Sequence, residues 1–145
     1  MDVKGFCKDF VGFYILFSFI GVPLINQIVI NAPHEKTKEQ LEIILSKEKK
    51  KFHLNDKNLE IVFNDNIKNS CAGKIDNENY FISLSKKQRN ENILRHEFYH
   101  VAKGHCDRRY ETQNLNNFFN IGMRFLDYTF IMEPTATIYS LTGLK

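Results

Sequence analysis

Two histidines with a glutamate between them constrain this chain more than any other feature. The stretch RHEFYH at positions 95–100 repeats histidine after four positions. On an α-helix, residues four apart lie one turn apart on the same face, so the imidazoles of His96 and His100 can reach one metal ion. Glu97 is turned by about 100° from His96, which places its carboxylate beside that ion and not on it. The spacing therefore predicts a helical site for one Zn²⁺ ion, in which Glu97 activates a zinc-bound water.

The residues before the motif predict that its helix is entered from a small sheet. Residues 59–63 form a short β-type run, and residues 72–75 and 80–84 predict a β-hairpin. From 88 to about 104, apolar residues recur at helical spacing on the side away from the two histidines. Ser85 is the expected N-cap of this helix, and the glycine at position 104 is its expected stop. The motif thus falls on an amphipathic helix, as its chemistry requires.

Further helices are predicted on both sides of this core. Residues 37–52 carry apolar side chains on one face of a charged background, which is typical of an amphipathic helix. Residues 115–132 predict a second, mostly apolar helix that Pro134 interrupts, and a new short helix is expected from Glu133 to about Leu141. Together with the sheet, these elements predict an α+β fold in a single domain over residues 33–145.

The first 32 residues form a separate hydrophobic segment. Residues 10–30 are apolar over about the length that crosses a bilayer as a helix. A retained single-pass anchor is the first interpretation, a cleaved signal segment the second, and an apolar helix packed on the domain the third. The chain is accordingly expected to be membrane-associated through residues 10–30, or exported. The lysines that flank the segment on both sides leave the orientation open.

Charge and cysteine content narrow the function classes. The formal net charge of the 145 residues is only +3, and the lysine-rich stretch at 47–51 has no aromatic residues among it, so no nucleic-acid partner is expected. The three cysteines have no metal-binding spacing. Cys71 and Cys106 are compatible with one disulfide in an exported domain or with reduced thiols in a cytosolic one.

Catalytic zinc usually has three protein ligands, so one ligand remains to be found. His105 follows His100 by five positions, but the chain would have to fold back sharply to bring it to the same ion. Asp107 and Glu111 are further candidates downstream. Glu133 lies at the start of a predicted helix, with a small residue, Ala136, one turn later that would let two helices approach closely.

At this point the chain resembles a known group of enzymes. The His-Glu-x-x-His stretch at 96–100, followed at a distance by Glu133-Pro134-Thr135-Ala136, is similar to the gluzincin zinc metallopeptidases and, over residues 37–142, to their minimal single-domain members, the minigluzincins. The resemblance implies a zincin-like domain in which Glu133, on a "glutamate helix", is the third zinc ligand. It also implies that residues 80–84 form the edge strand along which a peptide or protein substrate pairs.

Two function classes follow. The first is a zinc-dependent metallopeptidase that hydrolyses peptide bonds, with His96, His100 and Glu133 as metal ligands and Glu97 as the catalytic base. The alternative is a membrane-tethered peptide-binding or regulatory module whose zinc site is structural or vacant. Two neighbouring residues are given ordinary roles: Tyr139 is interpreted as a core tyrosine and not as a group that stabilises an oxyanion, and His105 as a solvated histidine at a helix end.

Overall fold

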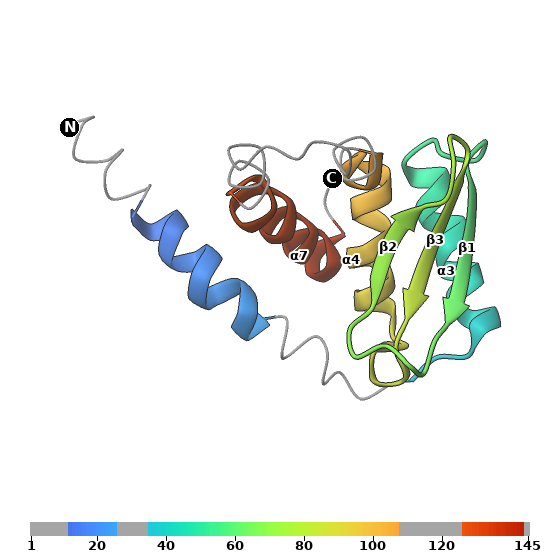
Figure 1. The fold of residues 1–145 in the computed structure, drawn as a ribbon, viewed down its shortest axis with the longest axis horizontal. Coiled ribbons are helices and arrows are strands. Elements are labelled where there is room, and N and C mark those ends of the chain that lie inside the picture. The colour runs from blue at the N-terminus through green and yellow to red at the C-terminus, as the bar shows by residue number, and fades with distance from the viewer. Residues whose placement is uncertain (1–11, 26–34, 108–125, 144–145) are drawn as a thin grey trace.

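The computed structural model describes residues 12–25, 35–107 and 126–143, and it shows an α+β fold (Figure 1). The predicted hydrophobic span at 10–30 and the predicted helix at 115–132 fall partly outside these ranges, and Glu111 falls wholly outside them. The elements that can be described are a small mixed sheet and the helices that pack around it.

The sheet contains β1 (Asn58–Phe63), β2 (Cys71–Lys74) and β3 (Asn79–Leu84), in the order β1-β3-β2. β2 and β3 are antiparallel and are joined by a short turn, which confirms the predicted hairpin. β1 pairs with β3 in parallel, with Asn58 opposite Asn79 at one end and Phe63 opposite Leu84 at the other. The described sheet is therefore mixed, and β3 is its central strand.

The central position of β3 contradicts the expectation that residues 80–84 form the edge strand. Along β3, every second residue from Tyr80 to Leu84 is almost fully buried. Periodicity, however, says nothing about which strand lies beside which. β1 pairs along the side of β3 that the hairpin leaves open, so the edges of the described sheet belong to β1 and β2.

Helix α3 (Lys38–Lys51) matches the predicted amphipathic helix. It begins with a capping box, in which the Thr37 hydroxyl accepts from the backbone N–H of Gln40 and the Gln40 side chain accepts from that of Thr37. Leu41 and Leu45 on its inner face are buried in the core shared with the sheet. Burial of a leucine side chain contributes roughly 1.5–3 kcal/mol, so this face secures α3 to the domain.

Helix α4 (Glu91–Ala102) carries the motif and lies between the sheet and the C-terminal helix (Figure 1). Its N-cap is Asn90, whose side chain accepts from the N–H of Ile93, and not Ser85 as predicted. A short 3₁₀ turn, η2 (Lys86–Gln88), separates Ser85 from the helix. Asn90, the next residue of a type that caps helices, therefore takes the N-cap position. Gly104 ends the helical stretch with a positive φ of 70°, as expected of a glycine at this position.

Helix α7 (Glu133–Thr142) packs against α4 on the side away from the sheet. It begins at Glu133, as predicted, and is followed by Gly143 with φ of 65°. The predicted interruption at Pro134 is wrong, because the π-helical turn η3 (Tyr128–Met132) runs directly into α7. In the wider π turn the N–H of Glu133 bonds to the carbonyl of Tyr128, and a widened turn relieves the clash that a proline ring causes with the preceding turn.

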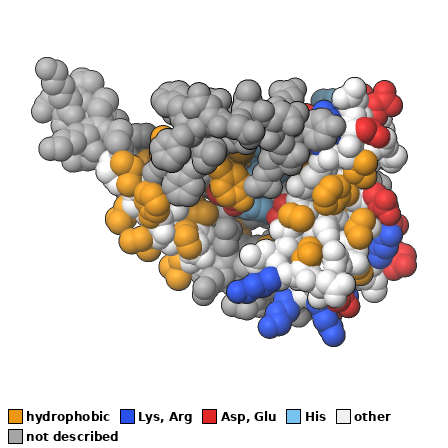
Figure 2. Space-filling view, in the orientation of Figure 1, with side chains coloured by type: hydrophobic (Ala, Val, Ile, Leu, Met, Phe, Trp, Pro, Cys, Tyr) orange, Lys and Arg blue, Asp and Glu red, His pale blue; other side chains and the backbone are white. Residues whose placement is uncertain are grey.

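The described part of the hydrophobic N-terminal segment, residues 12–25, is helical and contains the π turn η1 (Phe17–Gly21). Hydrophobic side chains gather over it in the space-filling view (Figure 2), and Phe13, Leu16 and Leu24 are each about three-fifths exposed. Among the described residues, no helix combines the length and the apolar character needed to cross a membrane. The predicted span over 10–30 extends past residues 12–25 on both sides and stays a prediction.

The two cysteines of the domain are not joined in a disulfide. Cys71 is exposed on β2, whereas Cys106 is buried in the core cluster after α4. Of the two predicted alternatives for this pair, the structure shows separate thiols.

Candidate metal centre

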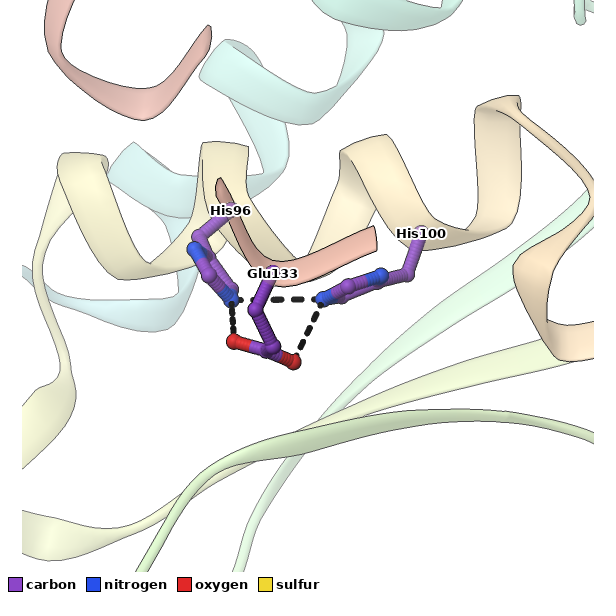
Figure 3. A group of neighbouring side chains, drawn as sticks. All are labelled: His96, His100 and Glu133. Carbon is purple, nitrogen blue, oxygen red and sulfur yellow. Dashed lines mark hydrogen bonds and ion pairs between the residues drawn. The ribbon is translucent and has the colours of Figure 1, made fainter. Parts of the chain in front are cut away.

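Three side chains from two helices converge on one point (Figure 3). The Nε2 atoms of His96 and His100, one turn apart on α4, lie 3.2 Å from each other. Glu133, the first residue of α7, places one carboxylate oxygen 3.3 Å from the Nε2 of His96 and the other 3.4 Å from that of His100. Residues 33 or more positions apart along the chain are thus brought together by the packing of α7 on α4.

These separations suit a small tetrahedral ion. Zinc lies about 2.0–2.1 Å from histidine nitrogen, so two ligands at a tetrahedral angle are about 3.3 Å apart. The two Nε2 atoms are 3.2 Å apart, and each lies 3.3–3.4 Å from a different carboxylate oxygen of Glu133, close to that value. One donor atom from each of the three residues can be chosen so that all lie within 4.8 Å of one another. Two imidazoles and one carboxylate also match a known donor set for catalytic zinc, in which the fourth position is left to water or substrate. The group can therefore hold a metal ion.

In the metal-free protein, the pairing of His96 with Glu133 favours the charged form of both side chains. Burial opposes protonation of His96, but its bond to Glu133 and the nearby charges of Glu97 and Glu133 outweigh this and raise the pKa of the imidazole. Burial acts to raise the pKa of Glu133, yet the bonds from His100 and His96 hold it well below its usual range. The carboxylate of Glu133 is therefore ionised, in the form that binds a cation.

Glu97 lies beside the three donor atoms and is not one of them. Its side chain is buried, and burial raises the pKa of the carboxyl, although the charges of His96 and His100 partly offset the effect. The backbone N–H of Ala72, on the edge strand β2, donates to this carboxylate. A carboxylate with a raised pKa next to a metal position has the properties of a general base.

A second set of contacts fixes the helix that carries Glu133. The buried carboxylate of Glu48, on α3, accepts a hydrogen bond from the hydroxyl of Tyr139 on α7. The other oxygen of Glu48 accepts from Nε of Arg95, at 3.0 Å. Burial, followed by the bond to Glu48, raises the pKa of the Tyr139 hydroxyl, which keeps it protonated as a donor. One carboxylate thereby links α3, α4 and α7.

Sequence reasoning missed this link. The sequence patterns predict no specific partner for Arg95, and Glu48 stands in the lysine-rich stretch at 47–51. The only available signal was the position of Glu48 relative to the apolar face of its helix: it follows Leu41 by seven residues and Leu45 by three, so it shares their face. An acidic residue on a core face needs a partner, which was a reason to look for one.

The remaining candidates have other roles. The hydroxyl of Tyr139 is bonded to Glu48, in agreement with the prediction of a core tyrosine. Asp107 forms an ion pair with Lys74 at 2.8 Å and accepts from the hydroxyl of Tyr80, so it is held against the sheet. His105 is not among the donor atoms that could share an ion with His96, but it contacts His100. His105 thus lies just past the end of α4, as predicted, but it is half-buried and in contact with His100 instead of fully solvated.

Comparison with known proteins adds no further assignment. No protein-family model matches the chain, and neither the curated proteins nor the solved structures contain a match to it.

Proposed function

We propose that this protein is a zinc-dependent metallopeptidase with the ligand arrangement of the minimal gluzincins. The observation that carries the proposal is the convergence of two histidine nitrogens, 3.2 Å apart, on the Glu133 carboxylate, whose two oxygens lie 3.3 and 3.4 Å from them, with the carboxylate of Glu97 nearby. Two imidazoles, one carboxylate and an adjacent buried glutamate together supply both metal binding and proton transfer. A zincin-like fold is part of this proposal, and what supports it is the order of α3, sheet, α4 and α7.

The proposed roles follow from where each group lies. His96, His100 and Glu133 would hold the ion, which when bound supplies a Lewis acid that polarises the scissile carbonyl and acidifies water. Glu97 would accept the proton of the attacking water and pass it to the leaving amine. Its raised pKa suits both steps, since a base that is too weak would not accept the proton and one that is too strong would not release it.

The substrate would be an extended peptide lying along β2. β2 is an edge strand of the described sheet, and the N–H of its Ala72 reaches the carboxylate of Glu97. A peptide that pairs with this edge would gain main-chain hydrogen bonds and would bring its scissile bond beside the base. The short length of β2, from Cys71 to Lys74, favours recognition of a few residues around the cleaved bond.

Substitution of Glu97→Gln tests the proposed activity. The amide keeps the shape of the side chain but cannot take a proton, so the variant should bind zinc as the parent does and lose cleavage of a fluorescence-quenched peptide library. Glu60→Gln, the same change at an exposed position on β1, should alter neither property. If the parent protein binds zinc but cleaves nothing under any condition in which it is folded, the peptidase proposal fails, and a binding or regulatory module replaces it.

We also propose that residues 10–30 associate the chain with a membrane. Support comes from the exposed apolar side chains of residues 12–25, among them Phe13, Leu16 and Ile20. The 145-residue chain should float with phospholipid vesicles in a density gradient, whereas a variant with Phe13, Leu16 and Ile20 replaced by Asp should stay in the soluble fraction. Equal distribution of the two proteins would contradict the association.

A further inference from the structure

His105 contacts His100 on the side of the imidazole ring that faces away from the donor atoms. The Nδ1 atoms of the two histidines are 2.9 Å apart, and the rings are tilted by 55° with centroids 5.2 Å apart. The other ring nitrogen of His100, Nε2, faces His96 and Glu133. One ring of His100 thus bridges the candidate metal position and His105.

Proton placement on the ring gives this contact a direction. A metal-binding ring nitrogen carries no proton, so a neutral His100 that binds metal through Nε2 must carry its proton on Nδ1. That N–H can then donate only to an acceptor, and the atom it faces is the Nδ1 of His105. His105 accepts if its own proton is on Nε2. The geometry is self-consistent with metal binding by His100.

We propose that His105 is a positioning residue that fixes the tautomer and the ring orientation of His100 for metal binding. The inference rests on the zinc site of the proposed function, but not on peptide cleavage. Partners of this kind hold the ligand ring in place and increase its basicity, and their removal weakens metal binding by about 10–100-fold. His105 would therefore act through His100, without touching the ion.

The chain around His105 holds it in this place. Gly104, with φ of 70°, reverses the backbone at the end of α4, in a conformation that other residues adopt only with strain. Cys106 is buried in the core cluster, and Asp107 is bonded to Lys74 of β2 and Tyr80 of β3. The residues on both sides of His105 are thus fixed, so its contact with His100 belongs to a constrained turn and not to a loose helix end.

Zinc affinity of three variants tests the inference. In competition with a chelator, His105→Ala should bind zinc about 10–100-fold more weakly than the parent chain. His105→Asn should recover most of that loss, because the asparagine side-chain oxygen lies about where histidine has Nδ1 and can accept the same hydrogen bond. His53→Asn removes an exposed imidazole outside the site and should bind like the parent. Parent-like affinity of His105→Ala, or an Asn variant as weak as the Ala variant, would overturn the inference.

A measurement on the unchanged protein avoids any folding defect of the variants. With ¹⁵N-labelled histidine and bound zinc, a scalar coupling between the Nδ1 atoms of His100 and His105 should appear across the hydrogen bond, with the proton assigned to His100. A His100 that carries its proton on Nε2, or shows no coupling, contradicts the inference. Zinc binding without peptide cleavage would defeat the proposed peptidase alone, whereas a parent chain that binds no zinc would defeat both proposals.

Discussion

The two sides of α4 differ in chemistry: one carries apolar core residues and the other carries ionisable residues. The side that faces the sheet carries Leu94, Phe98 and Val101, which are at most 1% exposed and pack into the main core. The side that faces α7 carries His96 and His100, with Glu97 beside them next to β2; burial and the charges of neighbouring groups, Glu133 among them, shift the pKa values of His96 and Glu97. The first side stabilises the fold through apolar burial, and the second holds ionisable groups close together at some cost in desolvation. Stability and chemistry are therefore separable by substitution on a single helix.

The largest effect on stability is expected from the sheet side. Leu94→Ala removes a fully buried side chain and leaves a cavity, so the free energy of unfolding should fall by about 2–5 kcal/mol. Ile43→Ala, at an exposed position on α3, should change it by less than about 0.5 kcal/mol. Urea unfolding followed by circular dichroism measures both. A small loss for Leu94→Ala would mean that this side of α4 is not the main support of the fold.

An intermediate effect on stability is expected at the hydrogen bond that joins α7 to α3. Tyr139→Phe removes the donor to the buried Glu48 carboxylate and leaves an oxygen without that bond, which costs about 1–3 kcal/mol. Tyr99→Phe removes a hydroxyl from the ring stacked on Tyr139, at 4.9 Å between centroids, and serves as the matched control. The same unfolding experiment compares them. If both variants lose equally little, the link through Glu48 does not hold α7 in place.

Substitutions on the side of α4 that faces α7 are expected to weaken zinc binding while changing the stability of the fold little. His96→Ala removes one of the three donors, so zinc affinity should fall by more than the 10–100-fold of an indirect partner. The variant should remain folded, because the sheet side of α4 is unchanged. Chelator competition and a thermal melt of the same preparation separate the two readouts. Unfolding of His96→Ala without metal would contradict the division of α4 into two sides.

The smallest effect is a dependence of stability on pH. The raised pKa of His96 means that its pairing with Glu133 stabilises the metal-free fold below the ordinary histidine value of 6.5, and that this contribution is lost as the pH rises through the raised pKa. The lowered pKa of Glu133 means that its contribution is present above the ordinary glutamate value of 4.5 and is lost as the pH falls further. The stability difference between parent and His96→Ala should therefore be greatest between those values. A difference that grows above pH 8 would contradict this assignment.

The two sides also differ in how far sequence could predict them. The sheet side follows from helical periodicity, and the pair of histidines follows from their spacing, so both depend on residues close together in the chain. Glu133 was selected by resemblance, since no local rule relates it to His96, and it is the packing of α7 on α4 that brings them together.

What could not be predicted depended on strand order or on turn geometry. The residue pattern of β3 indicates a strand but not its neighbours: β1, from earlier in the chain, pairs with β3 in parallel, so β2 is the edge strand that reaches Glu97. The contact of His105 with His100 requires the positive φ of Gly104, which turns the chain back on the helix. Gly104 was expected to end the helix, but a helix stop does not specify where the next side chain points.

Zinc binding by the parent chain and by two alanine variants tests the central claim most directly. The parent should bind one zinc ion per chain, Glu133→Ala should lose most of its affinity, and His105→Ala should lose about 10–100-fold while still binding one ion. That order would support Glu133 as a ligand and His105 as a positioning residue for the ligand His100. If His105→Ala abolishes binding while Glu133→Ala binds like the parent, the ligand assignment and the account built on it are wrong.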